Sequence, residues 1–457
     1  MIPISLKDIT KAVNGVISDE KYNDICVSNI TIDTRKINEK DFFIPIKGNN
    51  FDGHSFIDSA FKKGAICVLS ADKYRKYDKP VIYVDDTREA LKDFAQYYIS
   101  LFNIPVIAIT GSVGKTTTKD IIASVLSQKY NVVKTEGNFN NEIGLPLTIF
   151  NINYETEVVV LEMGMNNFGE IHNLSKIAKP NIAVITNIGV SHIENLGSRE
   201  GILKAKCEIF DYMNKNDKAV LNIDDDLLST IENKYTFDIF WYGIKNKGNI
   251  YADNILKNGV NSISCDIFIN NDSFNVNIPV PGEHMVLNAM SATIVGDILG
   301  LSLLQIKKGI EEFVPSKMRM SVIKTKNNTT IINDVYNANP ISMKSAIDVI
   351  CEAEEKKICI LGDMFELGEF ANDMHYEIGY YISKKNIDKV ICIGDLSKNI
   401  YEAILLNKSI DVFYYNTKEQ FIKNDLDNII DIGSIILVKA SRGMQFEEIV
   451  EKIKEVK

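Results

Sequence analysis

The sequence has little that would point to a membrane, a disulfide framework or a nucleic-acid partner. No run approaches about eighteen consecutive apolar residues, and the first residues lack the basic and apolar segments of a signal peptide, so we expect no membrane span and no secretion. The seven cysteines are scattered and include no CxxC pair, which favours a reduced, cytoplasmic protein. The net charge of −10 argues against non-specific nucleic-acid binding. Low-complexity segments and repeats of fixed period are also absent.

What is present is typical of a large globular protein. The chain has 457 residues, 45% of them hydrophobic, which exceeds one ordinary core and predicts several domains. From residue 105 onward, Val/Ile-rich runs that end in Gly, Thr, Asp or Asn alternate with helical stretches. This rhythm predicts parallel sheets covered on both faces. Residues 236–281 instead show alternating strands around an Asn-Gly turn, which predicts an antiparallel extension.

These patterns predict an α/β protein of three domains. We expect a small N-terminal α/β domain over residues 1–100, a central P-loop parallel-sheet domain of the ATPase type over residues 101–315, and a C-terminal Rossmann-like α/β domain over residues 316–457. Ligands of such sheets bind beyond the carboxyl ends of the strands, so residues at those ends are the candidate site residues.

The segment "TGSVGKTT" lies between a predicted strand and a predicted helix and has the chemistry of a phosphate site. Gly111 and Gly114 allow backbone N–H groups to approach phosphate, Lys115 supplies a positive charge, and the hydroxyl of Thr116 suits Mg²⁺. The full Walker pattern is not met, because Ile109 stands where its first glycine is expected. We nevertheless predict phosphate binding, since the strand-to-helix context is present.

Two further strand ends carry potential metal ligands. Glu162 ends the run "VVVLE" and His192 follows the run "IAVITN", and a carboxylate at the end of a buried strand is well placed for a hard cation. We predict both as metal ligands beside the phosphate loop. The helix "REGILKAKCEIF" offers Lys204 and Lys206, and motif chemistry alone does not choose between them or exclude a solvated basic face.

Other polar residues have equally plausible structural roles. Asn288, in a loop entering a helix, could contact a base edge or cap a turn, and Arg319, between the second and third domains, could reach a phosphate when domains close. Asp334 is at a predicted strand end, and Asn337 and Asn339 follow it in a loop that is equally good turn chemistry.

Taken together, the chain resembles the Mur ligase family over nearly its whole length. The signatures are "GNFNNEIGLPLT" (137–148), "INDVYNANPISM" (332–343), "ILGDMFELGEF" (360–370), "VKASRGMQFEEIV" (438–450), and, near the start, "DTR" (33–35) and "IKGNNFDGHSFI" (46–57). The resemblance implies a first domain that binds a UDP-sugar, a second that binds ATP, and a third that binds the incoming amino acid or dipeptide. The implied reaction is ATP-dependent ligation of D-alanyl-D-alanine to UDP-N-acetylmuramoyl-tripeptide for peptidoglycan synthesis.

The resemblance also implies residue roles and cofactors. It implies ATP binding by Gly111, Ser112, Val113, Gly114, Lys115, Thr116, Thr117, Asn288, Arg319 and Asp334. It implies binding of two Mg²⁺ ions by Thr116, Glu162, His192 and a carbamate of Lys206, and catalytic roles for Lys115, Glu162, His192 and Lys206. It implies substrate binding by Asp33, Arg35, Lys47, Asp52, His54, Asn138, Asn140, Asn141, Tyr336, Asn337 and Asn339. The substrates are small molecules, and we expect a monomer.

The chain departs from the family pattern at three positions and leaves alternatives open. Met285 stands where Asn is common, Val335 where Ser is common, and Cys207 where Gly is common, which could tune nucleotide affinity. Family members that add diaminopimelate or lysine carry a "DNPR"-like motif where this chain has "NANP". Folylpolyglutamate synthetase shares the core but would not need "FDGHSF" or "GNFNNEIG". A P-loop switch protein would lack a second-substrate domain, which residues 316–457 argue for.

Overall fold

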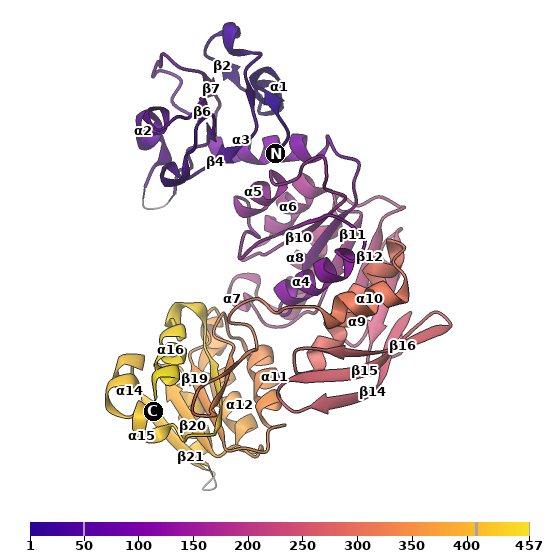
Figure 1. The fold of residues 1–457 in the computed structure, drawn as a ribbon, viewed down its shortest axis with the longest axis vertical. Helices are drawn as coiled ribbons and strands as arrows, with labels where there is room; N and C mark the ends of the chain where they lie inside the picture. Colours follow the sequence, from indigo (N-terminus) through magenta and orange to yellow (C-terminus); the bar gives the residue numbers. More distant parts are fainter. Residues whose placement is uncertain (49–50, 407–409, 457) are drawn as a thin grey trace. The chain divides into compact units, whose positions relative to one another are not determined.

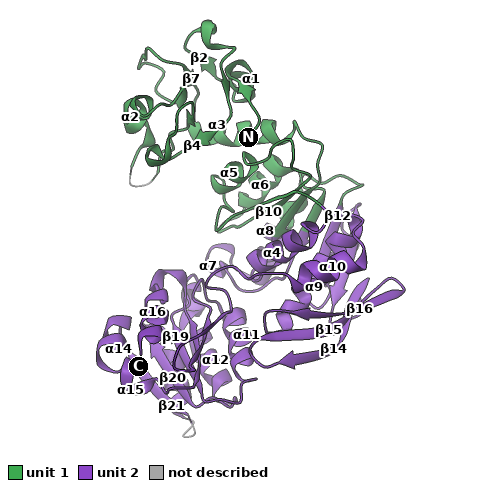
Figure 2. Cartoon of the chain, in the orientation of Figure 1, with its two compact units in different colours: residues 1–109, 130–183, 207–217 green, residues 110–129, 184–206, 218–457 purple. Residues whose placement is uncertain are grey.

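The computed structural model describes residues 1–48, 51–406 and 410–456 (Figure 1), so Asn49 and Asn50 of the predicted nucleotide-sugar segment lie outside the described residues. Contacts divide the chain into two compact units (Figure 2). Unit 1 contains residues 1–109, 130–183 and 207–217, and unit 2 contains residues 110–129, 184–206 and 218–457. The predicted domain boundaries near 100 and 315 stay predictions. Among the helices of the described ranges, none is long and apolar enough to cross a membrane.

The first part of unit 1 is a small sheet with helices. Its elements are β1 (Ile4–Ser5), α1 (Leu6–Ala12), β2 (Val16–Ile17), η1 (Glu20–Tyr22), β3 (Cys26–Val27), β4 (Ile30–Thr31), η2 (Thr34–Lys36), β5 (Phe42–Phe43), η3 (Gly53–Phe56), α2 (Ile57–Lys62), β6 (Cys67–Ser70), β7 (Val81–Tyr83) and α3 (Thr87–Ile99). The sheet has the order β2-β7-β6-β5-β4, and β2 alone of these strands runs antiparallel to its neighbour within the described residues. Phe43, Ile57 and Val68 belong to the core beneath α2.

Helix α3 joins this sheet to the next part of unit 1. The side chain of Asp86 caps its start by accepting from the backbone N–H of Arg88 at 2.6 Å. Its apolar residues recur at helical spacing, so Phe94 and Tyr98 are both fully buried. The ring centres of Phe94 and Phe150 are 4.9 Å apart, and the Tyr98 hydroxyl donates to the carbonyl of Ile152 at 2.6 Å. The helix therefore packs against residues that follow it by more than fifty positions.

The remaining part of unit 1 carries buried parallel strands. Its elements are β8 (Val106–Thr110), β9 (Val132–Lys134), α5 (Gly144–Ile149), β10 (Val158–Glu162), α6 (Glu170–Ala178), the start of β11 (Ile182–Ile185) and η4 (Glu208–Phe210). Strand β10 pairs in parallel with both β8 and β9, and all of its residues are buried. A continuous apolar run is what a strand covered on both faces requires. Glu162 is the last residue of this strand, as predicted.

Unit 2 begins with the segment that follows β8. Its first elements are α4 (Lys115–Leu126), α7 (Ile193–Leu196), α8 (Arg199–Cys207), β12 (Lys218–Asn222), η5 (Leu228–Ile231), β13 (Asp238–Gly243), β14 (Ile250–Asn258), β15 (Ser262–Ile269), β16 (Asp272–Ile278), α9 (Glu283–Ile298) and α10 (Leu303–Glu311). Strands β12, β13 and β14 pair in parallel, whereas β14, β15 and β16 are antiparallel. Gly259 has a φ of +59° in the turn between β14 and β15, which confirms the predicted antiparallel extension.

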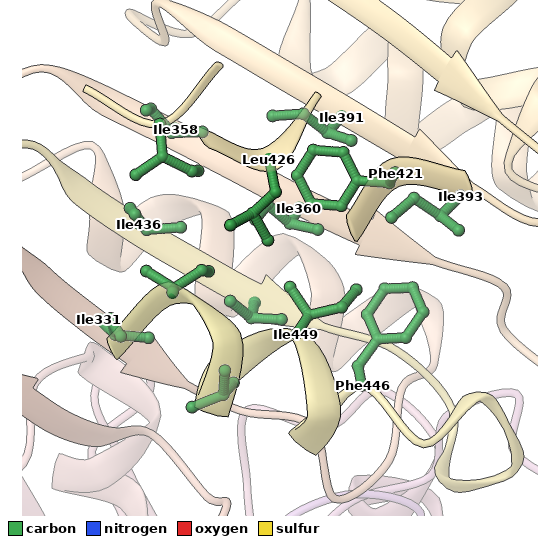
Figure 3. Close-up of a cluster of buried hydrophobic side chains, with 14 of the residues drawn as sticks. Ile331, Ile358, Ile360, Ile391, Ile393, Phe421, Leu426, Ile436, Phe446 and Ile449 are labelled. Atoms are coloured by element: carbon green, nitrogen blue, oxygen red, sulfur yellow. The ribbon is translucent and has the colours of Figure 1, made fainter. Parts of the chain in front are cut away.

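The C-terminal part of unit 2 is a second α/β layer structure. Its elements are β17 (Ser321–Lys324), β18 (Thr330–Asn333), α11 (Pro340–Ile350), β19 (Lys357–Gly362), η6 (Gly368–Phe370), α12 (Ala371–Ile382), β20 (Lys389–Ile393), α13 (Lys398–Leu405), β21 (Asp411–Tyr415), α14 (Lys418–Asn424), α15 (Leu426–Ile429), β22 (Ile435–Lys439), η7 (Arg442–Met444) and α16 (Glu447–Glu455). The strand order is β17-β18-β22-β19-β20-β21, and β17 is antiparallel to β18. Figure 3 shows Ile360, Ile436 and Phe446 in the core that α14–α16 cover. This arrangement positions the carboxyl ends of β18, β19 and β22 side by side.

Candidate active site

The predicted phosphate loop is a strand-to-helix turn that requires its glycines. Gly111 has a φ of +151° and Gly114 a φ of +84°, and Gly114 directly precedes helix α4. A Cβ atom on Gly111 would lie 1.9 Å from Oγ1 of Thr186, so no other residue fits without displacing that side chain. The first N–H groups of a helix have no intrahelical acceptor and attract anions. The start of α4 therefore has the geometry of a phosphate site.

The loop is held by the segment that follows β11. The backbone N–H of Ser112 donates to the carbonyl of Asn187 at 3.1 Å, and the N–H of Val113 donates to Asn187 Oδ1 at 3.0 Å. The Val113 carbonyl accepts from Oγ1 of Thr186 at 2.6 Å and from Nδ2 of Asn187 at 3.0 Å. Asn187 was missed in the sequence analysis, although its place directly after a buried strand is the signal that could have found it. The carbonyl, Oδ1 and Nδ2 of Asn187 are all used to hold the backbone of the phosphate loop.

Two lysines approach this loop from different elements. Nζ of Lys115 donates to the carbonyl of Gly111 at 2.8 Å, so its charge lies over the loop. Lys206, on α8, is 1% exposed, whereas Lys204 is exposed. Burial lowers the pKa of the Lys206 ammonium well below its ordinary value, and the nearby charge of Lys115 lowers that pKa further. Burial therefore distinguishes Lys206 from Lys204, as the family resemblance had done.

Glu162 is a buried carboxylate, and one of its two oxygens accepts a hydrogen bond. Its Oε1 accepts from Nδ2 of Asn140 at 2.8 Å, and its backbone N–H donates to Oγ1 of Thr135 at 3.0 Å. Its Oε2 is buried and has no hydrogen-bond partner among the residues that the structure describes. A buried charged oxygen without a partner is costly unless a cation occupies the position. Asn140, which was predicted to bind substrate, is thus also a support for Glu162.

The residues predicted to hold magnesium fit the ion by their chemistry. Within residues 1–48, 51–406 and 410–456, no group of three or more His, Cys, Asp and Glu side chains could hold a metal. The predicted set contains two such residues, Glu162 and His192, and depends on Thr116 and on a carbamate of Lys206 for more oxygen ligands. The orphaned Glu162 oxygen fits a hard cation, and a lysine of lowered pKa fits carbamate formation, which needs the neutral amine. Glu162 lies in unit 1 and the other three in unit 2, so their assembly stays a prediction.

His192 is paired with a carboxylate that the sequence analysis assigned no role. His192 Nδ1 lies 2.9 Å from Oε2 of Glu366, which follows β19 in the segment "GDMFELG". His192 lowers the pKa of the Glu366 carboxyl, and the charge of Lys115 lowers that pKa further. Glu366 is therefore close enough to Lys115 of the phosphate loop to interact with its charge. The motif "ILGDMFELGEF" had contributed to the resemblance, but no sequence pattern pairs these two residues.

The residues predicted on the nucleoside side lie against α4 and the third domain. Oδ1 of Asn288 accepts from Oγ1 of Thr118 at 3.1 Å, and Nδ2 of Asn288 lies 3.8 Å from Sδ of Met285, in hydrogen-bond geometry. The departure at Met285 therefore replaces a polar neighbour of Asn288 by a weak sulfur acceptor. The guanidinium of Arg319 lies 4.0 Å from the ring centre of Tyr336, which holds this cation in place.

Asp334 is fixed at the end of β18 by a buried lysine. Nζ of Lys439, at the end of β22, donates to Oδ2 of Asp334 and to the carbonyl of Asn337 at 3.0 Å. Oδ1 of Asp334 accepts from the backbone N–H of Met320 at 3.1 Å. His284, at the start of α9, is near both charges, and burial lowers its pKa. Lys439 and His284 were missed in the sequence analysis, and the ending of the strand "IILVK" in a lysine was the available signal.

The predicted dipeptide loop has structural hydrogen bonds as well. Oδ1 of Asn339 accepts from the backbone N–H of Ser342 at 2.9 Å and caps α11, and Oδ1 of Asn337 accepts from the N–H of Ala338 at 2.9 Å. Nδ2 of Asn339 donates to Oγ of Ser191 at 3.0 Å, and Ser191 Oγ donates to the carbonyl of Ser112 at 3.3 Å. Within unit 2, this loop is therefore connected to the phosphate loop.

The predicted substrate residues of unit 1 form local pairs. Asp33 and Arg35 make a two-pronged ion pair, which lowers the pKa of Asp33 to about 2. Asp52 forms an isolated antiparallel β-bridge with Lys47, and its Oδ1 accepts from the backbone N–H of His54 at 2.9 Å. Oδ1 of Asn141 accepts from the N–H of Gly144, the first residue of α5, at 2.9 Å, and the Asn138 carbonyl accepts from the N–H of Asn140 at 2.7 Å. Their predicted roles with substrate stay predictions.

Comparisons with known proteins identify the family. The Mur ligase middle domain matches residues 109–296, the "Mur ligase, glutamate ligase domain" matches residues 318–442, and the "Mur ligase family, catalytic domain" matches residues 27–99. A ligase of Bacillus subtilis is 41% identical over 100% of this chain and 99% of its own length. The chain belongs to the Mur ligase family.

Within that family, the similarity extends to one kind of ligase. The Bacillus subtilis relative is a UDP-N-acetylmuramoyl-tripeptide--D-alanyl-D-alanine ligase. The crystal structure of MurF from Acinetobacter baumannii has a TM-score of 0.92 and 29% identity over 100% of this chain and 99% of its own. MurF from Thermotoga maritima in complex with ADP has a TM-score of 0.85 and 30% identity over 94% of this chain and 97% of its own. The predicted family, three-domain α/β fold and ligase activity are thereby confirmed.

Proposed function

We propose that this protein uses ATP to join D-alanyl-D-alanine to UDP-N-acetylmuramoyl-tripeptide, the two substrates for which its relatives of similar length are named. The product is the UDP-linked pentapeptide for peptidoglycan synthesis, released with ADP and phosphate. In this proposal residues 1–100 bind the UDP-sugar, residues 101–315 bind ATP and residues 316–457 bind the dipeptide. The enzyme would act in the cytoplasm as a monomer.

The observation that supports this proposal most is the link between the phosphate loop and the third domain. The carbonyl of Ser112 accepts from Ser191 Oγ at 3.3 Å, and Ser191 Oγ accepts from Asn339 Nδ2 at 3.0 Å. A Cβ atom on Gly189 would lie 2.6 Å from Cδ1 of Ile341, so the two parts also pack closely here. A ligase needs its second substrate at the transferred phosphoryl group, whereas a nucleotide switch does not.

The first chemical step is phosphoryl transfer to a carboxylate. The terminal carboxylate oxygen of the tripeptide attacks the γ-phosphorus, the bond to the β-phosphate oxygen breaks, and ADP leaves an acyl phosphate behind. The start of α4 and the ammonium of Lys115 would stabilise the negative charge on the transferring group. Arg319, held on the ring of Tyr336, would contact the γ-phosphate from the third domain.

The proposal includes magnesium held by Thr116, Glu162, His192 and the carbamate of Lys206. When bound, Mg²⁺ would neutralise charge on the phosphate oxygens. The protein's part is to supply the buried oxygen of Glu162 and the neutral amine of Lys206, which gains a carboxylate-like group on reaction with CO₂. Two ions are proposed, with the carbamate beside the second.

The second step forms the amide. The free amine of the dipeptide attacks the acyl carbon, a tetrahedral intermediate forms, and phosphate leaves with the oxygen that came from the carboxylate. The amine loses its proton in this step. The loop around Asn337 and Asn339 would hold the dipeptide. Lys439, which is paired with Asp334, holds this loop through a hydrogen bond to the carbonyl of Asn337. Exclusion of water matters because water would otherwise hydrolyse the acyl phosphate.

The test is phosphate release with each substrate omitted in turn. Release should depend on ATP, the UDP-tripeptide and D-alanyl-D-alanine together, and one pentapeptide should form per phosphate. Parallel reactions with the diaminopimelate and the lysine tripeptide identify the third residue. Equal release with ATP alone would indicate a switch or hydrolase and overturn the proposal.

A further inference from the structure

The contact between His192 and Glu366 joins two segments that lie far apart in the sequence. His192 precedes α7, and Glu366 lies in the loop between β19 and η6 of the C-terminal α/β layer. The Nδ1 and Oε2 atoms are 2.9 Å apart, and both residues belong to unit 2. The pairing therefore connects the segment beside the phosphate loop with the part proposed to bind the dipeptide.

The backbone at both ends of this contact is held in an unusual conformation. His192 has a φ of +63° and Glu366 a φ of +64°, in the left-handed region that residues other than glycine seldom adopt. Gly368, with a φ of +55°, lies so close to Glu194 of α7 that an added Cβ atom would be 3.2 Å from its side chain. The loop thus packs directly on α7. Such conformations persist where the surroundings enforce them and are concentrated at functional sites.

The direction of the hydrogen bond determines which nitrogen of His192 remains available. An ionised carboxylate only accepts, so Nδ1 carries the proton and donates to Glu366. A glutamate carboxyl is ionised at neutral pH. With Nδ1 protonated in this way, the lone pair of the neutral imidazole lies on Nε2. Carboxylates that accept from the second nitrogen of a metal-binding histidine fix its tautomer and ring orientation and raise its basicity.

We infer that Glu366 is a positioning residue that orients His192 and presents its Nε2 to the metal of the reaction centre. This inference rests on the proposed function, in which His192 is a metal ligand. It follows that the metal affinity of the nucleotide site depends on a side chain from the C-terminal α/β layer. In the opposite role, Glu366 would compete with the metal for His192. Removal of the Glu366 carboxylate would then raise the metal affinity instead of lowering it.

The test is Mn²⁺ binding to the full-length protein, measured by electron paramagnetic resonance with a non-hydrolysable ATP analogue present. Glu366→Ala should weaken Mn²⁺ affinity about 10-fold, within the range seen for residues that support metal ligands. Glu366→Gln should lose less, because its amide oxygen can still accept from Nδ1. Glu369→Ala, at an exposed glutamate of η6 directly after this loop, is the matched control and should bind like wild type. Unchanged or tighter binding by Glu366→Ala overturns the inference.

A double variant shows whether Glu366 acts through His192. On a His192→Ala background, Glu366→Ala should cause no further loss of Mn²⁺ affinity, because its partner is already gone. A full additional loss would mean that Glu366 acts through another group, which contradicts the inference. Failure of the proposed function is distinguishable: wild type would then release no phosphate in response to the tripeptide and dipeptide. Wild type that ligates normally, with equal Mn²⁺ affinity in Glu366→Ala, overturns the inference alone.

Discussion

Asn339 caps helix α11 with one side-chain atom and reaches Ser191 with the other. Its Oδ1 accepts from the N–H of Ser342 at 2.9 Å, and its Nδ2 donates to Ser191 Oγ at 3.0 Å. One residue therefore starts a helix of the third domain and ties that helix to the phosphate loop. The two roles can be separated by substitution.

Asn339→Asp should retain the cap and lose the donor to Ser191. Aspartate caps helices as well as asparagine does, so the free energy of unfolding should change little. Loss of one hydrogen bond, worth about 1 kcal/mol, should lower kcat/KM for the dipeptide about 5-fold. Asn339→Ala should lose both roles and about 1 kcal/mol of stability as well. Urea unfolding and steady-state kinetics check this. Wild-type kinetics in Asn339→Asp would show that the Ser191 contact is not functional.

Lys115→Ala should reduce ligation at least about 100-fold. Its ammonium lies 2.8 Å from the Gly111 carbonyl, over the loop that would hold the transferred phosphate, and removing one such charge-stabilising donor has an effect of about this size. Lys204→Ala, at an exposed position of α8, is the control and should retain near-normal activity. Rates of phosphate release with all substrates saturating provide the measurement. Near-normal ligation by Lys115→Ala would exclude the phosphate-loop assignment.

Gly111→Ala should disrupt the phosphate loop beyond the cost of its backbone conformation. The added Cβ would lie 1.9 Å from Thr186 Oγ1, so we expect about 1–3 kcal/mol lost to overpacking and much weaker binding of ATP. Gly433→Ala is the matched control, because Gly433 also has a positive φ, +78°, but apart from its two chain neighbours no described residue lies within 4 Å of the added Cβ. Thermal unfolding and nucleotide titration compare the two. Equal stability and equal ATP affinity would contradict the loop geometry.

Stability should fall as the pH is lowered through the ordinary pKa of histidine, in part because of His284. Burial lowers the pKa of His284 in the folded protein, so the unfolded chain binds more protons below about pH 6.5. That contribution to stability is present above pH 6.5 and is lost as the pH decreases toward the folded-state pKa. His284→Gln should therefore show a smaller loss of unfolding free energy between pH 7 and pH 5 than wild type. The same loss in both proteins would show that His284 is not buried as a neutral group.

Local patterns were sufficient to predict several elements of the fold and the ends of some of its strands. The run "VVVLE" predicted a buried strand ending at Glu162, the Asn-Gly pair predicted the turn at Gly259, and "TGSVGKTT" predicted the turn into α4. Each of these signals depends on residues within a few positions of one another, where backbone preference and burial act directly.

The pairings that complete the site could not be predicted in this way. Glu366 and His192 are separated by more than 170 residues, and Lys439 and Asp334 by 105. Which strand ends become neighbours depends on the order of strands in the sheet, and many orders satisfy the same hydrophobic pattern. For Asn339 the sequence left turn chemistry open as an alternative to substrate binding, and the structure shows that this residue is the N-cap of α11.

The central claim, that ATP activates a peptide carboxylate, is tested most directly by following oxygen. The UDP-tripeptide is prepared with ¹⁸O in its terminal carboxylate and incubated with the protein, ATP and D-alanyl-D-alanine, and the released phosphate is analysed by mass spectrometry. Because the attacking carboxylate oxygen leaves with phosphate when the amide forms, the account predicts one ¹⁸O atom in each phosphate released. Phosphate that carries its new oxygen from water, with the label retained in the peptide, would contradict it.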